Sequence, residues 1–107
     1  MKDNKFYSMI GLAVKAGKVV SGGDNVVDAV RGGKAKLVLL SEDASKPTIK
    51  RITDKCTSYG VDVIKCGSKQ LFGKIASKNE TAAIAVIDSN FANELKRIGK
   101  EIMGVCE

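Results

Sequence analysis

Residues 20–44 decide the fold, and they read VSGGDNVVDAVRGGKAKLVLLSEDA. In this stretch Gly22-Gly23 precede a segment whose valines recur with helical spacing, and Gly32-Gly33 follow it. The next segment, Lys36–Ser41, contains the apolar run Leu37-Val38-Leu39-Leu40, which is typical of a strand buried on both faces. A helix that leads into such a strand indicates a sheet covered by helices.

The same alternation extends over the rest of the chain. Strands are predicted at about 18–21, 36–41, 61–65 and 82–87, with helices between them and at both ends. We therefore predict one domain, residues 1–107, with the fold class α/β: a three-layer α/β/α sandwich around a four-stranded mixed, largely parallel sheet. The short first strand is expected to run antiparallel at an edge, and the other strands are expected to be largely parallel.

The composition is that of a globular protein, with 44% hydrophobic and 28% charged residues. The apolar stretches are far too short to span a membrane, so we expect no membrane partner and a cytoplasmic location. Cys56, Cys66 and Cys106 are widely spaced and form no CxxC pair, which indicates reduced thiols. Histidine is absent from the sequence. We expect no metal and no cofactor.

The charge balance favours a polyanionic partner. Lysine and arginine number 18 against 12 aspartates and glutamates, which gives a net charge of +6. The basic excess is concentrated in residues 1–36.

Catalytic motifs are missing. No glycine segment has the spacing and residues of a phosphate-binding Walker loop or of a dinucleotide fingerprint. Glu42, Asp43 and Asp88 lie near predicted strand ends, and we interpret them as helix-capping or solvated residues. We predict that the protein is not an enzyme, and a small-molecule enzyme ranks third among the alternatives.

The turn at Gly22-Gly23 is the strongest candidate site. Glycines allow close backbone approach, and the following helix N-terminus attracts anions. Asp24, Asn25, Asp28 and Arg31 share one exposed helix face, and an asparagine amide can read a base edge. The alternative is that Asp24 merely caps the helix and the remaining residues form a solvated face.

Residues 20–44 also resemble the core of the kink-turn-binding ribosomal protein family, in particular its bacterial YlxQ-type branch. The resemblance extends from Phe6–Ala13 through Thr53–Cys56 to Phe91-Ala92. It implies an α/β/α sandwich that binds sharply bent RNA at tandem G·A pairs. Members of the family include archaeal and eukaryotic large-subunit proteins and core proteins of guide-RNA particles.

Members of this family contact RNA through a Gly-x-Asn-Glu-x-x-Lys segment at the start of the second helix. The matching positions here are Gly22, Asp24, Asn25 and Asp28, so Asp28 stands where relatives commonly carry lysine. The resemblance implies a second contact in the loop before the last strand, at about Ile75–Thr81.

Together these observations predict a ribosomal or ribosome-associated protein that recognises bent, kink-turn-like structured RNA. The alternative is a protein-interaction module on the same fold that has lost kink-turn binding, as Asp28 suggests. We expect a monomer that binds ribosomal or other non-coding RNA, with ribosomal proteins as candidate partners. The predicted RNA-binding residues are Lys15, Lys18, Gly22, Gly23, Asp24, Asn25, Asp28, Arg31, Lys34, Lys36, Ser77, Lys78 and Asn79.

Overall fold

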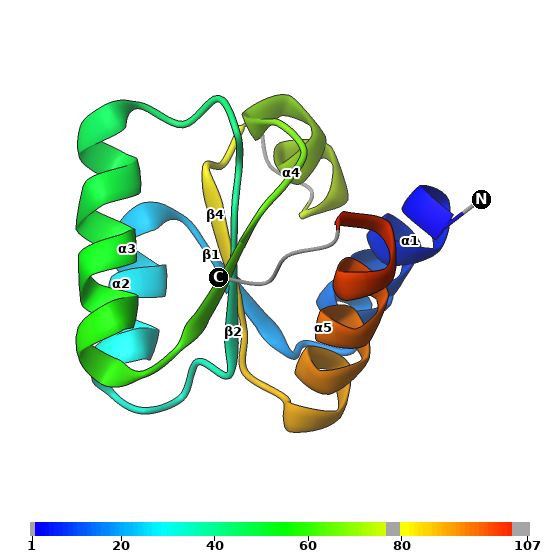
Figure 1. The fold of residues 1–107 in the computed structure, drawn as a ribbon, viewed down its shortest axis with the longest axis horizontal. Helices are drawn as coiled ribbons and strands as arrows, with labels where there is room; N and C mark the ends of the chain where they lie inside the picture. Colours follow the sequence, from blue (N-terminus) through cyan, green and yellow to red (C-terminus); the bar gives the residue numbers. More distant parts are fainter. Residues whose placement is uncertain (1, 77–79, 104–107) are drawn as a thin grey trace.

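A four-stranded sheet in the order β1-β4-β2-β3 forms the centre of the protein. We describe it from a computed structural model, which covers residues 2–76 and 80–103. Its strands are β1 (Val19–Ser21), β2 (Leu37–Leu40), β3 (Asp62–Lys65) and β4 (Ala83–Val86). Figure 1 shows the sheet edge-on between two layers of helices. The predicted α/β/α sandwich with a four-stranded mixed sheet is confirmed.

Two helices cover each face of the sheet (Figure 1). One layer holds α1 (Lys2–Lys15) and α5 (Ser89–Met103), the other holds α2 (Gly23–Arg31) and α3 (Lys46–Tyr59), and the short α4 (Lys69–Ile75) lies near one end of the sheet. Among the described residues, no helix is both long and apolar enough to cross a membrane.

Strands β2 and β4 lie in the middle of the sheet and are buried throughout, as predicted. Their side chains alternate between the two faces. Leu37 and Leu39 join the core against α1 and α5, whereas Val38 and Leu40 join the core against α2 and α3. A continuous apolar run is therefore required here, because both faces are covered.

The ends of α3 show how local sequence sets the element boundaries. The Ser45 hydroxyl accepts the Thr48 N–H at 3.3 Å, and Pro47 occupies the first turn, where its missing N–H has no cost. The helix ends at Gly60, whose φ of 69° is left-handed. Contacts within a few residues therefore set both ends of α3.

The prediction of a largely parallel sheet is wrong. The β1 strand runs antiparallel to β4 at an edge, as expected, but β4 also runs antiparallel to β2, and only β2 and β3 are parallel. The cause is the path of the chain around α4. Thr81 donates its N–H to the Lys69 carbonyl at 3.2 Å, so the chain returns to the end of the sheet from which it left. Strand β4 therefore starts beside the end of β2 and runs back.

Candidate nucleic-acid interface

The turn between β1 and α2 is tied to the start of β4. The Gly22 N–H donates to the Ala83 carbonyl at 3.1 Å and also to the Thr81 hydroxyl at 3.1 Å. That hydroxyl donates in turn to the Ala83 carbonyl at 3.2 Å. Gly22 adopts a φ of 96°, which a residue with a side chain would reach only under strain. The turn thus has a fixed geometry that depends on glycine and on Thr81.

These contacts bring together two segments that the resemblance implicated in RNA binding. The Gly22 turn meets Thr81, which ends the predicted second contact loop, although the two residues are far apart in the sequence. Ser77, Lys78 and Asn79 of that loop lie outside the described residues. Thr81 itself is buried and was not predicted as a site residue. Its hydrogen bond with Gly22 joins residues that are far apart in the sequence, so no local sequence pattern predicts it.

Helix α2 is amphipathic as predicted, because its valines are buried and Asp24, Asn25, Asp28 and Arg31 are exposed. The Asn25 amide donates through Nδ2 to the Ser21 carbonyl at 3.0 Å. Its Oδ1 can still accept a hydrogen bond from a ligand. Gly22, not Asp24, occupies the N-cap position, and no described side chain caps this helix end. The alternative in which Asp24 serves as the cap is therefore wrong.

Asp24 instead forms an ion pair with α3. Its Oδ1 accepts a hydrogen bond from Arg51 Nη2 at 2.7 Å. Arg51 was not among the residues predicted from the sequence, because an ion pair between residues on different helices leaves no local pattern. The pair places a guanidinium beside the predicted binding turn.

Three of the predicted cations, Lys18, Lys34 and Lys36, lie at the opposite end of the sheet. Val19 and Leu37 both pair with Val86, so Lys18 and Lys36, which directly precede them, flank the end of β4 on its two sides. Their backbones are fixed there, since Ile87 donates its N–H to the Lys18 carbonyl and Lys36 donates its own to the Val86 carbonyl. Lys34 and Lys36 follow α2, and all three lysines are exposed.

The predicted residues thus divide between two regions. We call Gly22, Gly23, Asp24, Asn25 and Thr81 the turn end, and Lys18, Lys34 and Lys36 the lysine end. Asp28 and Arg31 continue along α2 from the turn end toward the lysine end, and Lys15 ends α1 shortly before Lys18.

The acidic residues near strand ends have structural roles. Asp88 Oδ1 accepts the N–H groups of Asn90 at 2.7 Å and Phe91 at 3.2 Å, and so caps α5. Asp43 Oδ1 accepts the Lys69 N–H at 2.9 Å at the start of α4, and this bond lowers the pKa of Asp43. Glu42 is exposed. The interpretation of these residues as capping or solvated groups agrees with the structure.

The described cysteines are buried and unpaired, and Cys106 lies outside the described residues. Burial raises the pKa of Cys56 to about 11 and the pKa of Cys66 to about 12. For Cys66 the nearby charge of Glu42 acts in the same direction. Both groups are therefore neutral thiols near pH 7, the form that is neither a nucleophile nor a metal ligand. No group of three or more metal-ligating side chains occurs among the described residues.

The fold and this turn define the class: an α/β/α sandwich whose second helix starts at a glycine turn joined to the last strand. The chain belongs to the ribosomal protein L7Ae/L30e/S12e/Gadd45 family, whose model matches residues 4–96. The resemblance stated from the sequence is thereby confirmed.

Three comparisons define the relationship more closely. The RNA-binding protein YlxQ of Bacillus subtilis is 44% identical over 95 residues, which cover 89% of this chain and 95% of that protein. The structure of a Bacillus halodurans protein of unknown function superposes with a TM-score of 0.84 at 38% identity, covering 88% of this chain and 95% of the other. The Giardia lamblia 15.5kD RNA binding protein gives a TM-score of 0.78 at 19% identity, covering 96% and 88% of the two chains, and shows the fold alone.

Proposed function

We propose that this protein binds structured RNA, as a ribosomal or ribosome-associated protein that recognises a bent, kink-turn-like segment. One observation carries the proposal: the Gly22 N–H donates to the Thr81 hydroxyl, which holds the turn before α2 next to the start of β4. The family and the name of the Bacillus subtilis relative support the RNA-binding class.

At the turn end, the recognition elements would be backbone and short polar groups. Helix geometry leaves the N–H groups of Gly23, Asp24 and Asn25 without partners inside α2, so they can donate to an RNA acceptor. The exposed Asp24 carboxylate and the Asn25 Oδ1 can accept hydrogen bonds from base amino groups. We also assign RNA contacts to Ser77, Lys78 and Asn79, as the family resemblance implies.

We propose contacts to phosphates at the lysine end and at the neighbouring Lys15 and Arg31. Lys15, Lys18, Arg31, Lys34 and Lys36 are exposed cations on long, adaptable side chains, which suit phosphate neutralisation and do not read sequence. The sheet separates Lys18 and Lys36 from the Gly22 turn by the length of β1 and β4. An RNA that contacts both ends must therefore extend beyond the bend itself.

The remaining assignments are part of the same proposal. The protein would act without catalysis and without a cofactor, as one RNA-binding domain over residues 1–107 and as a monomer in the cytoplasm. The neutral, buried thiols of Cys56 and Cys66 support the absence of thiol catalysis. Ribosomal proteins are the candidate protein partners.

Asp28 favours a second candidate, a protein-interaction module that has lost kink-turn binding. Its carboxylate is exposed on the α2 face next to the turn end, where it would repel phosphates.

A gel-shift titration with a kink-turn RNA and a straight duplex of matched length and composition tests the proposal. RNA binding with a preference of about tenfold or more for the bent RNA is expected, since shape readout of this kind contributes at least about 1.4 kcal/mol. Equal affinities for the two RNAs would support RNA binding but contradict kink-turn recognition. No binding to either RNA would favour the interaction module.

A further inference from the structure

We propose that Arg51 on α3 is a phosphate-binding residue of the RNA surface at the turn end, held in position by Asp24. This inference rests on the proposed function, and it extends the interface from α2 to a second helix.

The position of Arg51 is the first observation. Its Nη2 bonds Asp24 Oδ1 at 2.7 Å, and its Nη1 lies 3.9 Å from where a methyl group on Gly23 would sit. The guanidinium therefore lies over the backbone at the start of α2. An anion that accepts the free N–H groups of this helix turn would be within reach of the same side chain.

The chemistry of the pair is the second observation. A guanidinium carries five N–H donors, of which Asp24 Oδ1 occupies one. The Arg51 side chain is 53% exposed, so the guanidinium is accessible to a ligand from solvent. An exposed ion pair of this kind contributes little to stability. It does restrict the rotamers of a long side chain, which lowers the cost of ordering Arg51 on a phosphate.

The local charge is the third observation. The first two turns of α2 carry Asp24 and Asp28 and no cation, and the basic residue of this helix, Arg31, is at its last turn. A phosphate at the turn end would meet two carboxylates on α2. Helix α3 supplies the opposing charge, since Arg51 pairs with Asp24, and Lys55 follows Arg51 by one helical turn on the same face.

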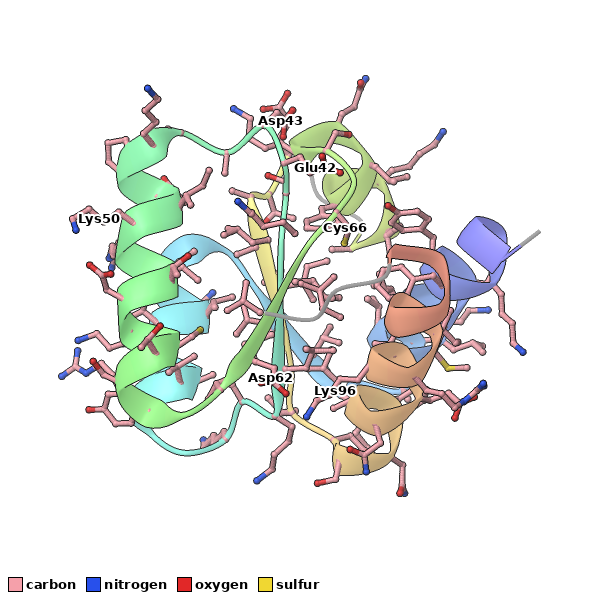
Figure 2. The ribbon with its side chains drawn as sticks, in the orientation of Figure 1. Glu42, Asp43, Lys50, Asp62, Cys66 and Lys96 are labelled. Carbon is pink, nitrogen blue, oxygen red and sulfur yellow. The ribbon has the colours of Figure 1, made fainter. Side chains whose placement is uncertain are left out.

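The chain also offers a matched control in Lys50. It is the neighbour of Arg51 on α3 and pairs with Asp54 of the same helix at 3.4 Å. Its side chain is 79% exposed, and Figure 2 shows it projecting away from the body of the protein. Loss of Lys50 changes the net charge as much as loss of Arg51 but leaves the turn end untouched.

The experiment measures dissociation constants for a kink-turn RNA over a range of salt concentrations. The proteins are wild type, Arg51→Ala, Lys50→Ala, Asp24→Asn and the double variant Asp24→Asn/Arg51→Ala. We expect Arg51→Ala to weaken binding about tenfold, as for a lost charge-assisted hydrogen bond, and to reduce the log–log salt slope by about 1. Lys50→Ala should stay within about twofold of wild type, because it removes a solvated charge remote from the RNA.

The Asp24→Asn background separates two possible roles of Arg51: direct contact with phosphate, and neutralisation of the Asp24 charge. If Arg51 binds phosphate itself, its removal weakens binding in this background too. The inference is overturned if Arg51→Ala has no effect there, or if it equals Lys50→Ala in wild type. Both of these results leave the proposed function standing, whereas a wild-type protein that binds no RNA overturns the function and the inference together.

Discussion

The turn end and the lysine end are held by different interactions. At the turn end, side chains hold the backbone: the Thr81 hydroxyl accepts the Gly22 N–H, and the Asn25 amide donates to the Ser21 carbonyl. The Arg51 side chain also pairs with the Asp24 side chain. At the lysine end, backbone hydrogen bonds of the sheet fix the chain around Val86. The side chains of Lys18, Lys34 and Lys36 form no ion pair within the described residues.

From this difference we infer different tasks for the two ends. A surface whose backbone groups are fixed in advance can discriminate between shapes, because a ligand of the wrong shape leaves those groups unpaired. Unpaired lysines on flexible stems neutralise phosphates wherever these lie, so they add affinity that depends on salt but not on shape. Our account is that the turn end recognises the bend and the lysine end contributes charge.

Gly22→Ala is expected to have the largest effect, because it forces a side chain onto a backbone with φ of 96°. The strain is about 1–3 kcal/mol and would displace the turn from Thr81. We expect the preference for bent RNA to fall by roughly one to two decades. Gel shifts with bent and straight RNA measure the preference, and thermal unfolding measures the strain.

Gly33→Ala is the control for this change. Gly33 also has a positive φ, 75°, but lies between α2 and the lysine end. Its substitution should destabilise the fold by about 1 kcal/mol and leave the preference for bent RNA intact. Equal losses of preference in the two variants would show that general destabilisation, and not the turn, is responsible.

Asp28→Lys tests whether the α2 face next to the turn end contacts RNA. Reversal of an exposed charge near phosphates is worth about 1–3 kcal/mol after screening, so binding to kink-turn RNA should tighten by roughly one to two decades. Binding to a straight duplex should tighten much less. Equal gains on both RNAs would indicate a diffuse charge effect, and no gain on either would place α2 outside the interface.

The double variant Lys18→Gln/Lys36→Gln tests the lysine end. Removal of two phosphate contacts should weaken binding to both RNAs by about tenfold at low salt. It should also reduce the magnitude of the log–log salt slope by about 2. The ratio of the two affinities should not change. If this variant lost the preference for bent RNA, the division of tasks between the two ends would be wrong.

Asp43→Ala is expected to have the smallest effect, on the stability of the fold at the start of α4. The Lys69 N–H lowers the pKa of Asp43 below its ordinary value of 3.8, so this carboxylate stabilises the fold above that pH. The contribution is lost as the pH falls through the lowered pKa. Thermal unfolding should therefore show a variant that is less stable than wild type near neutral pH, and this difference in stability should narrow as the pH falls below 3.8. A difference independent of pH would contradict this role.

The fold was largely predictable because its elements depend on local patterns. Leu37–Leu40 is apolar throughout since both faces of β2 are covered, and Ser45 and Gly60 mark the ends of α3 through contacts within a few residues. The direction of β4 was not predictable, because it depends on a hydrogen bond between Thr81 and Lys69 across the α4 segment. The order of helices and strands along the sequence would be the same whether β4 ran parallel or antiparallel to β2.

The candidate site was predictable in part for the same reason. The Gly22 turn is a local feature, and its glycines are visible in the sequence. The placement of Lys18 and Lys36 at the far end depends on strand register, and the pairing of Arg51 with Asp24 depends on the packing of α3 beside α2. Charge counted along the sequence therefore suggested one basic site where the folded chain has two separate regions.

The salt dependence of the affinity ratio tests the central claim most directly. Dissociation constants of the wild-type protein for a kink-turn RNA and a matched straight duplex would be measured from low to moderate salt. We predict that both affinities fall steeply, with log–log slopes of roughly −3 to −6, while the ratio between them stays nearly constant. A ratio that falls to one as salt rises would show that the preference is electrostatic and that the turn end does not read shape.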